Sequence, residues 1–406
     1  MRVFLVFISL FPALFGSVKL GVDVFFEKAL FNKYKDKNIA ILTNHTGVDS
    51  NLKPTINRFI ENKLNIKAIF TPEHGFYGSA YAFEKVKNSN LSKDLPIYSL
   101  HGNTRRPTSQ MLEGLDVIFF DIQEIGCRAY TYFTTLSYVM EEAAKKNIEV
   151  VVLDRPNPLG GDLVDGPMLE DEWRSYIGYI NVPYCHGMTI GELALYFNDE
   201  YKIQCNLTVI PMEGWKRQFS YEDTELFWIP PSPYIPEPDT PFYSTATGIL
   251  GELKILNIGI GYTMPFKIVG APWIDANLFA EKLNSQKLPG VYFHPFYFKP
   301  FYGLYKGEEC QGVKIIITDK KKYKPVSVQY LILGIIKSMY PKEFEKRLVK
   351  SKKCIDLFCK ANGTEKIYQI LLKEKYPAWK MIELQNSQNK FFTEKRKKYL
   401  IPSYAN

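Results

Sequence analysis

The sequence lacks the short motifs that mark many nucleotide-binding and acyl-transfer enzymes. Neither GxGxxG nor the P-loop pattern GxxxxGKS/T occurs in its 406 residues, so the two common glycine-rich phosphate cradles are not expected. GxSxG is absent as well, which argues against a serine nucleophile on a strand-to-helix turn. The chemistry has to come from other residues.

Cysteine is also scarce. The six cysteines include no CxxC pair, so a thiolate zinc site and a disulfide framework are not expected. One bridge, for example between Cys354 and Cys359, is compatible with an oxidising compartment. Small buried apolar positions are the favoured role for these side chains.

An apolar run at the N-terminus indicates where in the cell the protein is located. Arg2 precedes apolar residues at 3–15 and then Gly16 and Ser17, which is the order found in export signals. The run is short for a bilayer span, so residues 1–18 are predicted to be a cleaved signal peptide, with an uncleaved anchor as the alternative. The mature chain is therefore expected to be exported, periplasmic or extracellular, without a stable membrane span.

Charge and composition limit the class of protein. The net charge of +8 comes from Lys and Arg spread along the chain, and no nucleic-acid-binding motif accompanies it. Nucleic acid is therefore not expected as a partner. With 46% apolar and 15% aromatic residues, the chain is expected to be globular and to form two domains.

Apolar runs alternate with helical stretches through the first half, which predicts an α/β fold. This spacing is typical of strand–helix–strand repeats and predicts a Rossmann-like, mostly parallel sheet with helices on both faces. A helix is expected at 131–147, and Thr189 with Glu192 has the spacing of a capping box. The runs are NIAILT (38–43), IKAIFT (66–71), LPIYS (95–99), DVIFFD (116–121) and EVVVLD (149–154).

A proline-rich crossing at 228–244 separates this half from a second one. A strand at 312–319 and a helix at 327–340 predict a smaller C-terminal α/β domain. The predicted division is a catalytic domain at 19–244 and an auxiliary domain at 245–406 that lines the cleft.

Ionisable residues follow the predicted strands. Ligands of open parallel sheets bind at the carboxyl ends of the strands, so the loops there are expected to converge. Glu73 and His74 follow the second strand, and Asp121, Glu124 and Asp154 follow later ones. Several carboxyl groups in one partly dry cleft provide an acid and a base, because their pKa values are pushed apart.

Other residues at the same edge leave alternatives open. His74, His101 and His186 each precede a glycine, but none has the close paired spacing of a zinc helix, so metal binding is the less favoured role. Arg128 is followed by Tyr130, and this pairing of a cation with aromatic side chains suits a sugar that carries an anion, although the tyrosines equally suit a core. These residues favour an exported hydrolase that acts on a carbohydrate and uses carboxyl groups.

A set of ordered motifs resembles a known family across nearly the whole mature chain. The chain is similar to the exo-β-N-acetylmuramidases, the family known as DUF1343. The resemblance implies a Rossmann-like catalytic domain, a smaller auxiliary domain with the active cleft between them, and removal of terminal N-acetylmuramic acid from peptidoglycan fragments. The motifs are TNHTGVD (43–49), PEHGFYG (72–78), DIQEIGCRAYTY (121–132), LDRPNPLGG (153–161), HGMTIGELA (186–194), PSPYIP (231–236) and GAPWID (270–275).

The same resemblance implies roles for individual residues. Glu73 is the predicted general acid, with His74 orienting it, and Asp121 or Glu124 is the predicted second carboxyl group. Arg128 or Arg155 is expected to hold the lactyl carboxylate of the sugar. The full set of predicted substrate-binding residues is Asn44, Gln123, Arg128, Tyr130, Tyr132, Asp154, Arg155, Asn157, His186 and Glu252.

The segment 252–263, ELKILNIGIGYT, departs from the pattern. Glu252 matches the family, but Ile258 and Ile260 replace an acid and an arginine, and Tyr234 replaces an asparagine. Two alternatives therefore stay open: a diverged, catalytically weak sugar-binding paralogue, and a metal-dependent hydrolase. No cofactor and no metal are expected, and the sequence leaves the oligomeric state and the choice between retention and inversion open.

Overall fold

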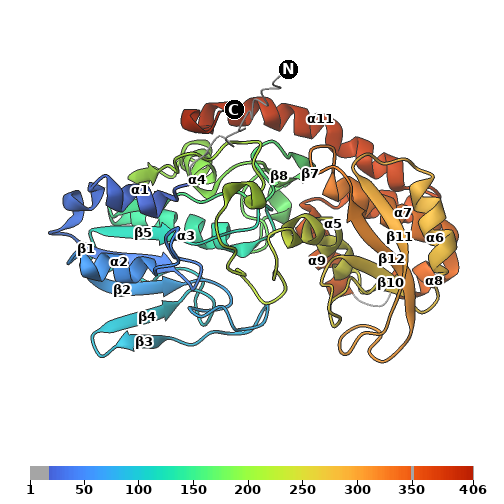
Figure 1. Cartoon of the computed structure of the whole chain (residues 1–406), viewed down its shortest axis with the longest axis horizontal. Helices are drawn as coiled ribbons and strands as arrows, with labels where there is room; N and C mark the ends of the chain where they lie inside the picture. Colours follow the sequence, from blue (N-terminus) through green and yellow to red (C-terminus); the bar gives the residue numbers. More distant parts are fainter. Residues whose placement is uncertain (1–17, 349–351, 406) are drawn as a thin grey trace, which may run out of the picture.

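The computed structural model describes residues 18–348 and 352–405. The predicted signal peptide at 1–18 lies almost entirely outside the described residues, so export stays a prediction. Figure 1 shows the N-terminal α/β part on one side, the C-terminal part on the other, and the long helix α11 (Ala378–Arg396) running along both. Within the described residues, no helix combines the length and the apolar character that a bilayer crossing requires.

The N-terminal part is built on a seven-stranded sheet of order β3-β4-β2-β1-β5-β6-β9. Every neighbouring pair is parallel except the edge pair β3 and β4. The predicted α/β fold and all five predicted strands are confirmed, and β3 and β9 are additions. The strands are β1 (Asn38–Thr43), β2 (Asn65–Thr71), β3 (Ser89–Ser92), β4 (Leu95–Ser99), β5 (Val117–Asp121), β6 (Glu149–Leu153) and β9 (Leu207–Ile210).

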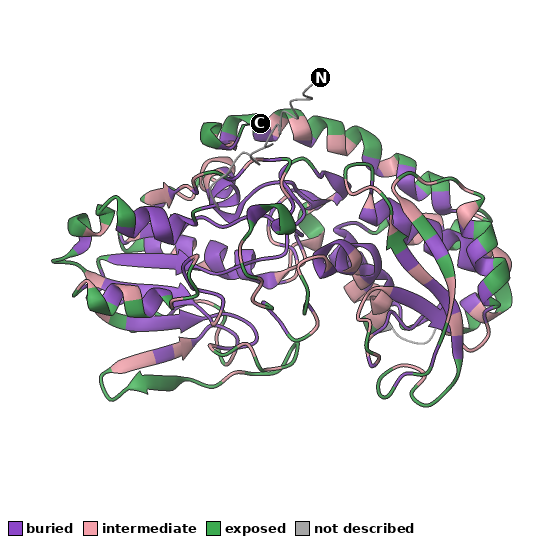
Figure 2. Ribbon diagram, in the orientation of Figure 1, coloured by how far each residue is buried: buried purple, intermediate pink, exposed green. Residues whose placement is uncertain are grey.

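Helices cover both faces of this sheet, as the sequence predicted. In β1, Ile39 and Ile41 enter one core with α1 and α2, whereas Ala40 and Leu42 enter another with α3 and α4. Alternation of this kind follows from the two-residue period of a strand. Figure 2 shows the central strands buried along their length. The helices are α1 (Gly21–Glu27), α2 (Thr55–Glu61), α3 (Thr131–Lys145) and α4 (Ile190–Glu200).

The predicted capping box at the start of α4 is confirmed. The Thr189 hydroxyl accepts a hydrogen bond from the Glu192 backbone, and the Glu192 carboxylate accepts one from the Thr189 backbone. Thr189 therefore has the structural role that its spacing indicated.

The C-terminal part packs helices against a small antiparallel sheet of order β10-β12-β11. The predicted strand at 312–319 and helix at 327–340 are confirmed as β12 and α7. The strands are β10 (Ile268–Ala271), β11 (Val291–Phe298) and β12 (Cys310–Ile317). The helices are α5 (Thr240–Glu252), α6 (Ala276–Asn284), α7 (Pro325–Met339), α8 (Pro341–Leu348), α9 (Lys352–Asn362), α10 (Lys366–Lys373) and α11.

Shorter elements complete the chain. A separate two-stranded sheet pairs β7 (Asp165–Met168) with β8 (Pro183–Cys185). The 3-10 helices are η1 (Leu30–Tyr34), η2 (Asp171–Trp173), η3 (Tyr221–Thr224), η4 (Lys397–Tyr399) and η5 (Pro402–Tyr404). All six cysteines are free, and five of them are buried.

The C-terminal residues return to the first half of the chain. The Arg396 guanidinium donates to the carbonyl oxygens of Gly161 and His186 at 2.9 and 3.0 Å. The Tyr404 hydroxyl donates to Oδ2 of Asp154 at 2.7 Å. The division into 19–244 and 245–406 stays a prediction, since α5 and these contacts cross it.

Candidate active site

The PEHG turn directs Glu73 toward the interior of the protein. Strand β2 ends at Thr71, and the chain then turns so that the Gly75 amide donates to the Pro72 carbonyl at 3.1 Å. His74 and Gly75 have positive φ angles of 70° and 77°. Such angles are unfavourable for most residues, so the glycine makes this tight turn attainable. Glu73 is only 6% exposed as a result.

Two donors fix the Glu73 carboxyl group. Its Oε1 accepts a hydrogen bond of 2.9 Å from the Phe83 amide, and its Oε2 accepts one of 2.7 Å from the Thr131 hydroxyl. Thr131 is the first residue of α3, so the positive end of that helix dipole faces the carboxyl group. This buried acid is therefore oriented by neighbours from two other segments.

His101 lies beside Glu73, although the sequence did not place it among the predicted site residues. Its Nε2 is 3.6 Å from Oε1 of Glu73, and its Nδ1 is 3.3 Å from the Tyr176 hydroxyl. Burial lowers the pKa of His101, while the Glu73 carboxylate acts in the opposite direction. The Arg105 guanidinium lies 3.9 Å above the Tyr176 ring. The signal for His101 was its place directly after β4, at the same sheet edge as Glu73.

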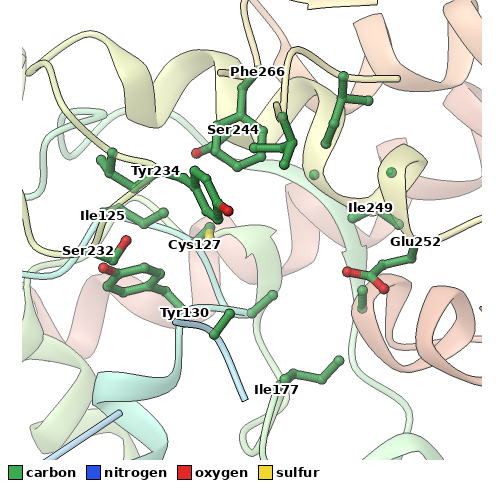
Figure 3. A pocket seen from close by; sticks show the side chains of 18 of the residues that line it. Ile125, Cys127, Tyr130, Ile177, Ser232, Tyr234, Ser244, Ile249, Glu252 and Phe266 are labelled. Carbon is green, nitrogen blue, oxygen red and sulfur yellow. The ribbon is translucent and has the colours of Figure 1, made fainter. Parts of the chain in front are cut away.

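A cavity of about 660 Å³ opens between the two parts of the chain and includes Glu73 in its wall. Its size lies in the usual range for small-molecule sites. The first part contributes Glu73, His74 and Tyr130, whereas α5 and the segment after it contribute Glu252 and Lys254. Figure 3 shows Glu252 on the opposite wall from Tyr130 and Ser232.

Most of the cavity wall is apolar. Side chains from both parts of the chain create this character, and an apolar surrounding strengthens electrostatic interactions. The apolar wall is made by Ile125, Ile177, Ile235, Ile249, Leu256, Ile258, Ile260, Phe266 and Leu304.

Four of the predicted site residues line the cavity: Glu73, His74, Tyr130 and Glu252. Nδ1 of His74 donates to the Ala80 carbonyl at 2.7 Å, which leaves Nε2 as the free ring nitrogen. Burial raises the pKa of Glu252, whereas the Lys254 ammonium acts in the opposite direction. Glu252 and Glu73 are the two carboxyl groups among the described residues in this wall.

Asp121 and Arg155 do not reach the cavity, and their predicted site roles need correction. Nε of Arg155 donates to Oδ1 of Asp121 at 2.6 Å, and the Thr55 hydroxyl donates to Oδ2. A second guanidinium nitrogen donates to the Val48 carbonyl at 2.6 Å. This buried ion pair ties the end of β5 to the loop after β6, and the bond to Val48 adds the loop after β1, so both charges are already satisfied.

Arg128 also points away from a ligand position. Its guanidinium donates to four backbone carbonyls, those of Pro167, Val182, Ala361 and Asn362, at 2.6 to 3.0 Å. Burial lowers the pKa of Arg128 to about 10. The prediction that Arg128 or Arg155 holds a sugar carboxylate therefore needs correction, because Arg128 instead joins the two parts of the chain.

Glu124 faces the interior of the first part. Its Oε2 accepts a hydrogen bond of 2.5 Å from the Gly126 amide, and its Oε1 is buried without a partner. Burial raises the pKa of Glu124 to about 8, so this group is protonated at neutral pH. It does not line the cavity, and its predicted catalytic role needs the same correction.

Asp154, Asn157 and His186 form a structural cluster behind the sheet edge. Asp154 accepts hydrogen bonds from the Thr189 hydroxyl at 2.7 Å and from the Gly191 amide at 2.8 Å, and burial raises its pKa to about 7. Asn157 donates to the Met188 carbonyl at 3.0 Å. Burial lowers the pKa of His186 to about 3. None of the three lines the cavity, so their predicted binding roles are corrected to structural ones.

Asn44, Gln123 and Tyr132 also hold the backbone in place. Oδ1 of Asn44 accepts from the Thr46 amide at 2.9 Å, and Nε2 of Gln123 donates to the Pro156 carbonyl at 2.8 Å. The Tyr132 hydroxyl donates to the Pro231 carbonyl at 2.5 Å. The predicted convergence of all these loops on one crevice is thus limited to the loops after β2 and β5.

Three tyrosines from separate segments gather at the cavity mouth. The Tyr302 and Tyr234 hydroxyls are 3.4 Å apart, and Tyr234 is part of the cavity wall. The hydrogen bond with Tyr302, burial and the neighbouring Tyr81 raise the pKa of Tyr234 to about 12. Tyr81 is 66% exposed and Tyr302 is 49% exposed, so both rings present faces to an arriving ligand. No pattern in the sequence indicated that these three rings would lie together.

A metal site depends on how potential ligands are arranged among the described residues. Among residues 18–348 and 352–405, no group of three His, Cys, Asp or Glu side chains is arranged to hold a metal ion.

The fold and the cavity define a two-domain α/β protein with carboxyl groups from both halves around one pocket, which is an arrangement suited to glycoside cleavage. Two family models match the chain: Exo-beta-N-acetylmuramidase NamZ, N-terminal, over residues 39–239, and its C-terminal counterpart over residues 242–401. The chain belongs to this NamZ exo-β-N-acetylmuramidase family of glycosidases, also called DUF1343, and the family resemblance seen in the sequence is confirmed.

Individual relatives agree with this membership. The chain is 40% identical over 333 residues to the peptidoglycan beta-N-acetylmuramidase NamZ of Bacillus subtilis, covering 81% of this chain and 79% of that protein. A crystal structure of a DUF1343 family protein from Bacteroides fragilis matches with a TM-score of 0.88 at 38% identity, covering 95% of this chain and 99% of the other. A second such protein from that organism matches with a TM-score of 0.73 at 27% identity, covering 96% and 100%.

Proposed function

We propose that this protein removes terminal N-acetylmuramic acid from peptidoglycan fragments and that Glu73 is its general acid. The observation that supports this most directly is the placement of the Glu73 carboxyl group. It lies in the wall of a cavity of sugar-binding size, and Phe83 and Thr131 fix its orientation. A carboxyl group held in a fixed orientation beside the bound sugar is what proton transfer to a glycosidic oxygen requires.

Glu252 is the second carboxyl group in this proposal, in place of Asp121 or Glu124. Glycoside cleavage needs stabilisation of a positively charged, oxocarbenium-like centre in addition to a proton donor. Glu252 extends from the end of α5 into the same cavity, whereas Asp121 is bound to Arg155 and Glu124 is buried elsewhere. Attack on the anomeric carbon then comes from water or from the acetamido group of the substrate.

In this proposal, the His101 side chain is an uncharged neighbour of Glu73. Because burial lowers its pKa, the imidazole is neutral at neutral pH and leaves the Glu73 carboxyl group without a buried ion-pair partner. The contact between Nδ1 of His101 and the Tyr176 hydroxyl holds the ring beside Glu73, so in this proposal His101 positions the carboxyl group and takes no part in the proton transfer.

The aromatic mouth is proposed to hold the rest of the saccharide. Sugar rings have apolar faces that pack against aromatic side chains, and Tyr81, Tyr234 and Tyr302 lie where the leaving part of a glycan would emerge. This arrangement supports an exo-acting enzyme with one sugar inside the cavity and the next at its rim.

Export is part of the proposal. The composition of residues 1–18 supports a signal peptide, and the mature enzyme would then meet cell-wall fragments in the periplasm or outside the cell.

The test is release of 4-nitrophenol from an aryl N-acetyl-β-muramide and from the matching N-acetyl-β-glucosaminide by the purified chain. We expect release from aryl muramides, unchanged by a chelator, and loss of at least about a thousand-fold in kcat for Glu73→Gln on a disaccharide substrate, whose leaving sugar hydroxyl needs a proton. Glu113→Gln, an exposed acid that precedes the start of β5 and so lies at the opposite end of the strands from Glu73, is the matched control and should keep full turnover. Full turnover by Glu73→Gln rejects the assignment. Binding without release supports a silent binding paralogue, and loss of activity with chelator supports a metal-dependent hydrolase.

A further inference from the structure

The charge of the cavity wall differs from that expected of a site for a sugar carboxylate. The charged groups in the wall are two carboxyl groups, Glu73 and Glu252, and a single ammonium, Lys254. Lys254 is exposed and follows the end of α5, so it lies at the edge of the site. Free muramic acid brings a third carboxylate into this space.

The buried arginines near the site are already bonded to other groups. Arg128 donates to four backbone carbonyls, and Arg155 is paired with Asp121 and bonded to the Val48 carbonyl. The Arg105 guanidinium lies over the Tyr176 ring and is not part of the cavity wall. The wall therefore contains no guanidinium for bidentate recognition of a carboxylate.

The segment after Glu252 makes this end of the cavity apolar. Ile258 is buried and Ile260 is half-buried, and both contribute to the wall together with Leu256 and Phe266. Transfer of an ionised carboxylate from water to such a surface costs much free energy, whereas transfer of a neutral amide costs much less. Uncharged hydroxyl groups, including that of Ser232, remain in the wall to bond an amide.

We propose, on the basis of the function proposed above, that this site selects muramic acid whose lactyl carboxyl is already joined in an amide, as in a peptide-bearing fragment, over the free lactyl acid. Ile258 and Ile260 are the specificity-determining residues. They contact the lactyl group, and the wide cavity mouth leads the attached peptide to solvent.

A matched pair of substrates tests this selection: 4-nitrophenyl N-acetyl-β-muramide with a free lactyl acid, and the same compound as its lactyl N-methylamide. At pH 7 we expect kcat/KM to be at least about ten-fold higher for the amide. An equal value, or preference for the acid, overturns the inference while leaving the proposed function intact.

Release from neither compound instead counts against the proposed function. Calorimetric binding of the lactyl acid and amide of N-acetylmuramic acid to the Glu73→Gln chain then tests the inference without turnover. Tighter binding of the amide supports it, and tighter or equal binding of the acid overturns it.

Variants locate the source of the preference. Ile260→Arg places a guanidinium in the wall, and we expect the amide-to-acid ratio of kcat/KM to fall by at least about ten-fold. Ile60→Arg, at a position on α2 that is 54% exposed, is the control and should leave the ratio unchanged. If Ile260→Arg does not fold, Glu252→Gln removes one negative charge, and the binding ratio should shift toward the acid. An unchanged amide-to-acid ratio in the folded variant would show that the charge of the cavity wall does not determine the preference.

Discussion

The Thr131 hydroxyl donates a hydrogen bond of 2.7 Å to Oε2 of Glu73, across 58 positions of sequence. This contact joins the first residue of α3 to the turn after β2. It shows that the geometry of the acid depends on the segments after two strands, β2 and β5, and not on the PEHG turn alone.

Thr131→Val removes this bond and keeps the shape of the side chain. A hydrogen bond between uncharged groups contributes about 0.5–1.5 kcal/mol, so we expect kcat to fall by about two- to ten-fold. KM should stay unchanged, because the hydroxyl orients the acid and does not bind the sugar. Steady-state kinetics measure both constants. Thr393→Val on α11 is the control, since that hydroxyl bonds only within its own helix. An unchanged kcat in Thr131→Val would show that Glu73 needs no such orientation.

Tyr302→Ala removes one ring from the cavity mouth. Aromatic packing contributes about 0.5–1.5 kcal/mol, so KM for a disaccharide fragment should rise by roughly three- to ten-fold. The aryl monosaccharide has no second sugar ring to pack against Tyr302, so its KM should change less. Comparison of the two substrates measures the difference. Tyr376→Ala, with a ring that is 68% exposed on the C-terminal part, should change neither value. Equal effects on both substrates would contradict a role for Tyr302 at the mouth.

Arg128→Lys keeps a positive charge but cannot reach four carbonyls. We expect the free energy of unfolding to fall by about 3 kcal/mol or more, because buried acceptors lose their donors. Chemical denaturation measures the loss. Arg347→Lys is the control, since that guanidinium pairs with Glu343 within one partly exposed helix. If Arg128→Lys instead changed KM for the lactyl acid at unchanged stability, Arg128 would be a ligand after all.

Glu124→Gln changes how stability depends on pH. Burial raises the folded-state pKa of Glu124 to about 8 from an ordinary value of 4.5. Below pH 4.5 the carboxyl is protonated in both states, and its contribution is fully present. Between pH 4.5 and 8 the unfolded chain releases a proton that the folded chain retains, so the free energy of unfolding falls as pH rises.

The glutamine variant lacks this titration. Relative to wild type, its free energy of unfolding should rise by about 3–4 kcal/mol between pH 5 and pH 8. Denaturant unfolding at both values measures the change. The exposed Glu383→Gln should follow the wild type at each pH. Parallel curves for wild type and Glu124→Gln would contradict a buried, protonated Glu124.

The sequence by itself determined the α/β class, the five predicted strands and the place of Glu73 after β2. These features follow from local patterns: apolar runs of strand length, helical spacing between them, and a proline and a glycine that define a turn. The motifs also determined the family.

Only the tertiary structure decided which polar side chains face the cavity. Asp121, Arg128 and Arg155 follow or end the predicted strands as Glu73 does, yet their charges bind each other or backbone carbonyls. A loop sequence places a residue at a sheet edge, but the direction of its side chain depends on partners that are distant in sequence. For the same reason, His101 joined Glu73 only once β2 and β4 had paired in the sheet, and Tyr302 joined Tyr234 only once the two halves of the chain had packed together.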